Sequence, residues 1–239
     1  MKIETRKKIL RATEQGYDLI AEKFSATRKN FWSDLRFIAD FTQKGNKVLD
    51  YGCGNGRLLE ILPQNIDYFG VDISGRLIEL ARKKYSNTSN QIAFQRKLNF
   101  QKISSSKVIL PFENNFFDVI YSIAVFHHLP DKQYRFQILK ELKRVLKPKG
   151  YLIISVWNLW QNPYYKKIIQ NWKNKFFGKS KLDWNDCFID FKDNQNKVFS
   201  RFHHAFSQRE LENLFQKNNF QNIQIQKIQN KNLLIIGKK

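Results

Sequence analysis

An acidic residue followed by three closely spaced glycines is the feature of this sequence most directly tied to chemistry. In the stretch VLDYGCGNG, Asp50 precedes Gly52, Gly54 and Gly56 in a G-x-G-x-G spacing. Glycine permits turn angles that other residues avoid, and it lets a ligand approach the backbone closely. The preceding acid suits a cationic ligand group better than a phosphate. Asp72, which ends the next apolar run, can accept both hydroxyls of a ribose.

These residues need a scaffold that brings the ends of neighbouring strands together. Apolar runs alternate with segments of helical periodicity, which predicts a doubly wound, mostly parallel α/β sheet. The expected strands span 47–51, 67–72, 92–95, 116–125 and 151–157. The expected helices between them span 56–62, 75–85 and 133–147. Ser74 should cap the second of these helices, and Pro148 with Gly150 should end the third.

Three further parts of the chain lie outside this alternation. Helices are expected over 4–24, 34–41 and 208–218. Ser33 is the expected cap of the second, and Ser207 with Glu210 forms a capping box for the third. The stretches NIQIQKI and NLLIIGK should form a C-terminal hairpin. Residues 158–203 mix aromatic and lysine side chains, and we interpret them as an insertion over the C-terminal edge of the sheet.

Composition limits the class of protein. The 239 residues suffice for one domain with a sizeable core. Cys53 and Cys187 are too few for a disulfide framework or a zinc site. The N-terminal residues lack the apolar segment of a secretory signal, and no apolar run is long enough to span a membrane. A cytoplasmic protein with no membrane partner is therefore expected.

The net charge of +21 is the strongest compositional indication of a partner. Every part of the chain is positive, so the charge belongs to the folded body, which favours a polyanion such as RNA. A lysine-rich codon bias is an alternative source of part of the excess. A membrane surface is less favoured because no strongly amphipathic basic helix stands out.

Four stretches resemble a known enzyme family: YDLIAEKFSATRKNFW at 17–32, SIAVFHHL at 122–129, VWNLWQ at 156–161 and SRFHHAFSQRELENLF at 200–215. With the D-x-G-x-G-x-G motif, they are similar to class I S-adenosylmethionine-dependent methyltransferases. Among these, they resemble the tRNA wobble-uridine carboxymethyl methyltransferases, which include the methyltransferase half of the animal AlkB-type fusion enzyme. The resemblance implies a Rossmann-like, seven-stranded sheet with an insertion after the fifth strand. It divides a single domain into a helical cap, a cofactor-binding core, a substrate-capping insertion and a C-terminal helix with hairpin, at 1–46, 47–157, 158–203 and 204–239.

The sequence departs from the family pattern at three places. Phe202 and His203 replace two tyrosines, and Asn158 replaces an alanine. The family usually places an acid before L-P-F to meet the adenine, but here the stretch reads QKISSSKVILPF. Ser104–Ser106 or the backbone would then make the adenine contact.

The resemblance also implies a set of cofactor contacts. The residues expected to bind S-adenosylmethionine are Tyr17, Asp50, Gly52, Cys53, Gly54, Gly56, Asp72, Ile73, Ser122 and Ile123. In the family, the first acid and the glycines meet the methionine side, Asp72 meets the ribose, and Tyr17 closes over the cofactor. Cys53 is expected to be a small buried residue with no catalytic role. No metal is expected.

Four residues are expected to act on the substrate: Arg28, His127, Arg201 and His204. The two arginines are candidates for gripping a carboxylate or phosphate through two parallel hydrogen bonds. Surface or helix-end positions are the alternative. His127 would act as a base toward a hydroxyl acceptor. A structural role is the more frequent outcome for histidines at strand ends, and the same alternative applies to His204.

Three functions remain open from the sequence. The first is a methyltransferase that forms a methyl ester on 5-carboxymethyluridine at the wobble position of tRNA, with Trp157, Trp160 and Phe202 as candidates for base stacking. The second is a small-molecule methyltransferase of the quinone-precursor type. The third is a cofactor- and RNA-binding subunit without catalysis. The expected partners are tRNA rather than DNA and, as in some family members, a small zinc-containing activator protein.

Overall fold

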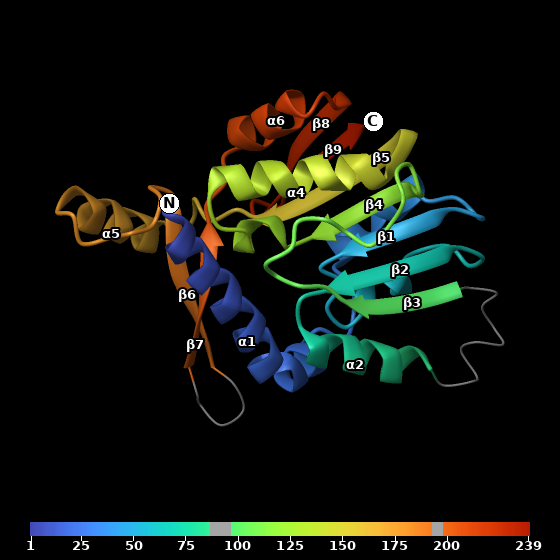
Figure 1. Cartoon of the computed structure of the whole chain (residues 1–239), viewed down its shortest axis with the longest axis horizontal. Helices are drawn as coiled ribbons and strands as arrows, with labels where there is room; N and C mark the ends of the chain where they lie inside the picture. Colours follow the sequence, from blue (N-terminus) through green and yellow to red (C-terminus); the bar gives the residue numbers. More distant parts are fainter. Residues whose placement is uncertain (87–96, 193–197) are drawn as a thin grey trace.

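A seven-stranded sheet forms the centre of the computed structural model, which describes residues 1–86, 97–192 and 198–239. The strand order is β3-β2-β1-β4-β5-β9-β8. Strands β1 to β5 pair in parallel, and β9 runs antiparallel to both β5 and β8. The bounds are β1 Lys47–Tyr51, β2 Asp67–Asp72, β3 Lys97–Lys102, β4 Phe117–Ile123, β5 Leu146–Trp157, β8 Gln221–Ile228 and β9 Asn232–Lys238. The predicted doubly wound sheet and hairpin are confirmed (Figure 1).

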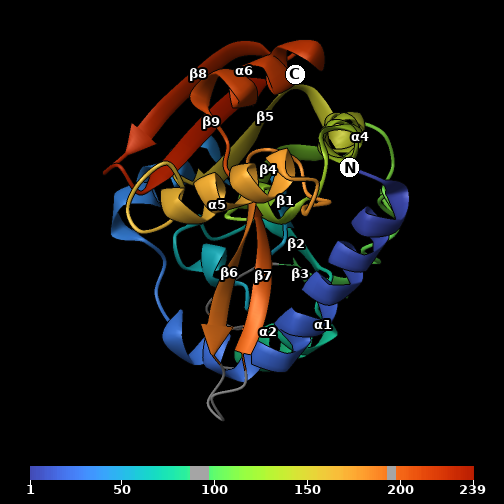
Figure 2. The ribbon, with the colours of Figure 1, turned by 90° about the vertical axis from the view of Figure 1, so that its left-hand side faces the viewer.

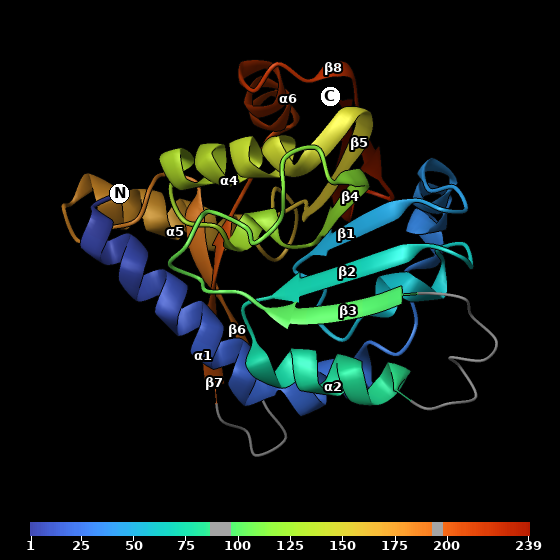
Figure 3. The ribbon, with the colours of Figure 1, turned by 45° about the vertical axis from the view of Figure 1, so that its right-hand side comes forward.

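Helices cover both faces of this sheet (Figure 3). Helices α4 (Lys132–Val145) and α6 (Gln208–Lys217) pack on one face through buried leucine and isoleucine side chains. On the other face lie α2 (Gly75–Tyr85) and the 3₁₀ helices η1 (Ser33–Phe41) and η2 (Arg57–Glu60). Strands buried on both faces explain the continuous apolar runs in the sequence.

Helix capping follows the sequence at two of three expected positions. The Ser74 hydroxyl accepts from the backbone N–H of Leu77 at 3.1 Å, and Ser207 accepts from Glu210 N–H at 3.1 Å. Ser33 is instead the first residue of η1, which begins without a side-chain cap. The predicted caps of α2 and α6 are therefore confirmed, and that of η1 was wrong.

Several element bounds differ from the predictions. The helix expected over 56–62 is reduced to η2, and α4 ends at Val145 because β5 begins at the next residue. Pro148 and Gly150 lie within β5, where the β4 pairing shifts register between Phe117 and Val119. An irregular strand segment tolerates proline and glycine there.

The sequence pattern did not predict β3. Its sequence is polar because it is an edge strand in which Phe100 is the single buried residue. The strand expected over 92–95 lies outside the described residues.

The insertion after β5 stands at the end of the sheet to which the parallel strands point (Figures 1 and 2). It contains α5 (Tyr165–Phe176) and a two-stranded antiparallel hairpin, β6 (Asp186–Lys192) and β7 (Val198–His204). Helix α1 (Ile3–Thr27) packs against this hairpin and is longer than the expected 4–24. Among the described residues, no helix is both long and apolar enough to cross a membrane.

Candidate active site

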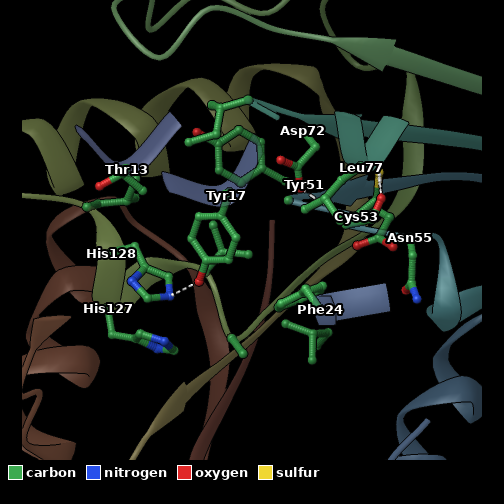
Figure 4. Close-up of a pocket in the computed structure, with 18 of the residues that line it drawn as sticks. Thr13, Tyr17, Phe24, Tyr51, Cys53, Asn55, Asp72, Leu77, His127 and His128 are labelled. Atoms are coloured by element: carbon green, nitrogen blue, oxygen red, sulfur yellow. Dashed lines mark hydrogen bonds between the residues drawn. The ribbon is translucent and has the colours of Figure 1, made fainter. Parts of the chain in front are cut away.

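A pocket opens where the C-terminal ends of β1, β2 and β4 meet α1 and β7 (Figure 4). This is the edge of the sheet at which ligands bind in doubly wound folds, beside the reversal of strand order. Eleven of the fourteen residues predicted to act on the cofactor or substrate line it: Tyr17, Arg28, Asp50, Gly52, Cys53, Gly54, Asp72, Ile73, Ile123, His127 and Arg201. Gly56, Ser122 and His204 do not line it.

The glycine loop forms one wall of the pocket. Gly52 has a φ of +81°, and a Cβ there would lie 2.3 Å from a methyl carbon of Val125. Gly54 donates its N–H to Asp72 at 2.8 Å. Gly56 also has a positive φ, but a Cβ there would meet Tyr85 and Phe100 rather than the pocket. The first two glycines therefore shape the pocket, whereas the third serves the packing behind it.

Two buried carboxyl groups face this loop. Asp50 accepts from the Tyr68 hydroxyl at 2.7 Å, and burial raises the pKa of Asp50 to about 7. Asp72 accepts from the N–H groups of Gly54 and Ser74, each at 2.8 Å. Burial raises its pKa to about 6, partly offset by these hydrogen bonds. A cationic or hydroxyl-bearing ligand would satisfy both carboxylates, because neither has an ion-pair partner within the described chain.

The remaining predicted cofactor residues divide between pocket and core. Cys53 lines the pocket with its thiol near Gly54, and burial raises the thiol pKa well above its ordinary value. Ser122 points into the interior, where its hydroxyl has no partner in the described residues. Ser104 and Ser105 line the pocket, where they can replace the acid that the family usually places at the adenine.

Tyr17 reaches across the pocket to His128 (Figure 4). The His128 ring lies 2.8 Å from the Phe202 carbonyl through Nδ1 and 2.7 Å from the Tyr17 hydroxyl through Nε2. A carbonyl only accepts, so Nδ1 carries the proton. Burial lowers the pKa of His128 to about 3, which leaves Nε2 as the acceptor for Tyr17. His128 is thereby a neutral anchor that holds the tyrosine in place.

His127 and His203 stack on each other behind this pair, with ring centroids 5.1 Å apart. The backbone N–H of Trp157 donates to His127 Nδ1 at 3.2 Å, so the proton of His127 is on Nε2. His203 Nδ1 donates to the Arg201 carbonyl at 2.9 Å. Because its single lone pair is already engaged, His127 is poorly placed to act as the predicted base. Burial also lowers its pKa well below the ordinary value.

His127, His128 and His203 place ring nitrogens within 4.8 Å of one another, as metal ligands would. The donor set does not fit a metal ion. Both nitrogens of His128 are used by protein groups, and the lone pair of His127 accepts from a backbone N–H. Only His203 Nε2 offers a free lone pair, and a metal site needs several.

Arg28 and Arg201 reach the pocket from α1 and β7. Arg201 is 5% exposed, its Nε has no hydrogen-bond partner in the described residues, and its guanidinium lies 5.5 Å from the Trp157 ring. Arg28 stacks on Phe24 at 4.3 Å. Burial and the charge of Arg201 both lower the pKa of Arg28. In the described part of the chain, neither arginine forms an ion pair with a carboxylate.

His204 lies outside the pocket, contrary to the expectation of a catalytic role. Its Nδ1 contacts Asp186 at 2.7 Å, and its Nε2 contacts Glu210 at 2.9 Å. Glu210 also pairs with Arg135 of α4 at 3.5 Å. With both nitrogens occupied, His204 joins the hairpin to α6 and α4, and the structural alternative accounts for it.

Arg57 was missed from the sequence. It follows the last glycine of the motif directly, lines the pocket, and places its guanidinium 3.6 Å from the centre of the Trp32 ring. Its position immediately after a ligand-binding loop was the available signal.

Residues 24–225 match the family model described as a methyltransferase domain. The chain belongs to this methyltransferase family. The methyltransferase is 32% identical over 165 residues to the Arabidopsis thaliana tRNA (carboxymethyluridine(34)-5-O)-methyltransferase, with 65% of this chain and 37% of the relative covered. It is 33% identical to the Xenopus tropicalis enzyme alkbh8 of the same description, with 69% and 23% covered. The chain thus spans about a third or less of the length of these curated relatives.

Solved structures show the same fold. A Methanosarcina mazei S-adenosylmethionine-dependent methyltransferase superposes with a TM-score of 0.70 at 23% identity, covering 88% of this chain and 98% of that one. A Haloferax volcanii methyltransferase, solved in complex with the Trm112 methyltransferase activator, gives 0.64 at 18% identity, with 95% and 96% covered. Family and fold indicate S-adenosylmethionine as the cofactor. The open glycine wall and the two unpaired carboxyl groups of the pocket fit it.

Cofactor affinity should rise with pH through about 7, the pKa of Asp50. We expect Asp50 to hold the cofactor's cationic amino group, which requires the ionised carboxylate. Below pH 7 the affinity should fall by about tenfold per pH unit. The stability of the free protein should change in the opposite direction. Because the folded-state pKa lies above the ordinary 3.8, stability declines as pH rises from that value to about 7.

Calorimetric titration with S-adenosylhomocysteine from pH 5.5 to 8, with thermal melts of the free protein, would measure both trends. The neighbouring groups Tyr68, Asp72 and Arg57 also act on Asp50. The Asp50→Asn variant therefore serves as the control and should lose the part of both profiles near pH 7, while the part near pH 6 that belongs to Asp72 remains. An unchanged pH dependence in this variant would assign the titration to another group.

Proposed function

We propose that this methyltransferase esterifies the carboxymethyl group of a modified wobble uridine in tRNA. The observation that carries the proposal is the pair Arg28 and Arg201. Both line the cofactor pocket, and neither is paired with a carboxylate in the described residues. Two cations that line one pocket without a carboxylate partner favour an anionic ligand. Arginine binds a carboxylate through two parallel hydrogen bonds, which fixes its orientation.

The histidines support a carboxylate acceptor over a hydroxyl. A hydroxyl needs a general base near the acceptor, whereas a carboxylate is already ionised at neutral pH. In this pocket His128 Nε2 accepts from Tyr17, and His127 Nδ1 accepts from a backbone N–H. The two histidines that line the pocket therefore offer no free base, which disfavours the quinone-precursor alternative.

The division of work then follows from the residues. Bound S-adenosylmethionine supplies an electrophilic methyl group. Arg28 and Arg201 orient the carboxylate oxygen, and positioning accounts for most of the rate in such a displacement. Asn55 donates to the Arg28 carbonyl at 3.2 Å and so ties the end of α1 to the glycine loop. This contact couples the arginine's position to the cofactor wall.

The insertion supports an RNA substrate. Its exposed side chains combine aromatic rings with lysines. Helix α5 projects from the end of the sheet (Figure 1). The exposed aromatic side chains of its described residues are Trp160, Trp172, Phe176, Phe177, Trp184 and Phe188. Six lysines lie between residues 166 and 181, and the single acid of residues 158–184, Asp183, pairs with the N-terminal amine. Aromatic rings interleaved with cations favour single-stranded RNA.

The test is methylation of tRNA that carries 5-carboxymethyluridine, with labelled S-adenosylmethionine and nucleoside mass spectrometry. We expect a methyl ester on that uridine, and a KM for tRNA that rises steeply between about 50 and 200 mM salt through counterion release. The assay should be run with and without a Trm112-type activator, since the Haloferax methyltransferase was solved with one. If cofactor binds but neither condition yields RNA methylation, a non-catalytic RNA-binding subunit or a small-molecule enzyme becomes the better interpretation.

A further inference from the structure

A second cavity adjoins the cofactor pocket. Its volume is about 640 Å³, larger than the about 120 Å³ of the cofactor pocket and within the about 300–1,000 Å³ range of ligand sites. We call it the outer cleft. It is lined by residues from the end of α1 and the start of η1, from η2, from the segment after β5, and from the turn between β8 and β9. Arg28, Trp32, Arg57 and Trp157 line both cavities, so the outer cleft leads directly to the arginine pair.

Apart from Thr27, Ser33 and Asp34, the side chains that line the outer cleft are of three kinds. The aromatic ones are Trp32, Trp157 and Tyr164, the amides are Asn30, Asn158, Gln161, Gln229 and Asn232, and the cations are Arg28, Arg57 and Lys231. Asp34 is the single acid in its lining. Aromatic faces suit a base, side-chain amides can pair with its donors and acceptors, and an excess of cations suits phosphate.

One wall of the outer cleft is held in place by Asn158, the residue that departs from the family motif. Its side-chain Nδ2 donates to the Asn230 carbonyl at 2.9 Å, and its backbone N–H donates to the Lys231 carbonyl at 2.9 Å. Its own carbonyl accepts from Gln161 Nε2 at 2.9 Å. Asn158 therefore fixes the hairpin turn and Gln161 against the end of β5. Hydrogen bonds within the protein therefore hold this wall in place.

Two side-chain amides in this lining keep hydrogen-bonding groups that no described residue uses. The Asn232 side chain is 7% exposed, and no hydrogen bond to its amide is found among the described residues. Gln161 uses its amide nitrogen internally and keeps its amide oxygen as an acceptor. A donor–acceptor pair of this kind matches the imide edge of uracil, which has one N–H between two carbonyl oxygens.

We propose that the outer cleft binds the nucleotide whose substituent is methylated. This inference rests on the proposed function. The pyrimidine packs against Trp157 and pairs with the amides of Gln161 and Asn232. Arg57 and Lys231 meet the flanking phosphates, and the carboxymethyl group passes Arg28 into the pocket. A splayed-out loop nucleotide fits such a site, whereas a base in a duplex does not reach it.

The test measures binding without turnover. Protein loaded with S-adenosylhomocysteine is titrated with anticodon stem-loop RNA and, separately, with uridine 5′-monophosphate. Gln161→Ala combined with Lys231→Ala should weaken RNA binding about tenfold or more, through one lost base contact and one lost phosphate contact. Gln216→Ala combined with Lys217→Ala is the matched control, because it removes the same residue types from the exposed side of α6.

The proposal predicts that RNA affinity falls in the Gln161→Ala and Lys231→Ala double variant alone. The same variant should show an increased KM for tRNA and a smaller change in kcat. Equal RNA affinities in the two double variants would overturn the proposal. An affinity for uridine 5′-monophosphate that is unchanged by the cleft substitutions would also overturn it. Unchanged thermal melts establish that the variants are folded. Failure of the proposed function would appear differently, as wild-type protein that binds RNA through the cleft and yet forms no methyl ester.

Discussion

Replacing Arg201 by glutamine should nearly abolish methyl transfer to carboxymethylated tRNA while leaving the protein at least as stable. A charged hydrogen-bonding partner of a buried anion contributes about 2–5 kcal/mol, and this corresponds to a loss of about 30- to several-thousand-fold in kcat/KM. Arg201 is 5% exposed, has an unpaired Nε and no carboxylate partner in the described chain. No carboxylate compensates its charge in the described part of the free protein, so we expect that removing the charge does not lower the melting temperature.

The melting temperature distinguishes a substrate-binding role of Arg201 from a structural role. An arginine that holds β7 in place would lower the melting temperature when replaced, whereas a substrate-binding arginine would not. Arg201→Lys should recover only part of the activity, because lysine lacks the planar fork. Arg209→Gln, an exposed substitution on α6, is the control for loss of one positive charge.

A second readout concerns the acceptor. Wild-type protein should bind tRNA with a carboxymethyl group more tightly than tRNA with the neutral carbamoylmethyl group. The neutral tRNA would therefore be only a weak competitive inhibitor. Arg201→Gln should lose this preference. If the variant methylates within threefold of wild type and keeps the preference, the carboxylate is bound elsewhere.

Asp72→Ala should abolish measurable cofactor binding and also destabilise the loop that carries the motif. The carboxylate accepts from the N–H groups of Gly54 and Ser74, and leaving two buried donors unpaired costs about 1–3 kcal/mol each. We propose that Asp72 also accepts from the ribose hydroxyls, which would lose this acceptor in the same variant. We expect a loss in cofactor affinity of about 100-fold or more, on the order of two charge-assisted hydrogen bonds.

The control for loop damage is Asp18→Asn. Asp18 accepts from the Ser74 hydroxyl at 2.6 Å and from Arg76 N–H at 3.1 Å, so it supports the same loop without lining the pocket. Calorimetric titration with S-adenosylhomocysteine and thermal melts with and without it would compare the two variants. Asp18→Asn should lose some stability and retain cofactor binding. Similar cofactor affinities for the Asp72 variant and wild type would remove Asp72 from the cofactor site.

The parts of the site that were predictable depend on local sequence. Asp50, Gly52 and Asp72 end or follow strands, and a parallel sheet brings the ends of its strands to one edge whatever else the chain does. The caps of α2 and α6 are equally local, since a serine hydroxyl reaches only its own first turn. The edge strand β3 was less predictable, because one buried face residue, Phe100, leaves almost no pattern to detect.

Contacts between distant segments were decided by the tertiary structure. The family motif named Arg28 and Arg201, but the packing of α1 on β7 is what places both in one pocket. Hydrogen bonds to Phe202 and Trp157 set the protonated nitrogens of His128 and His127, and no sequence spacing encodes them. The sequence by itself determined the sheet, the cofactor motif and the charge, because these follow from periodicity and composition. Burial and long-range hydrogen bonding decided which polar side chains remain free for a substrate, because both depend on neighbours far away along the chain.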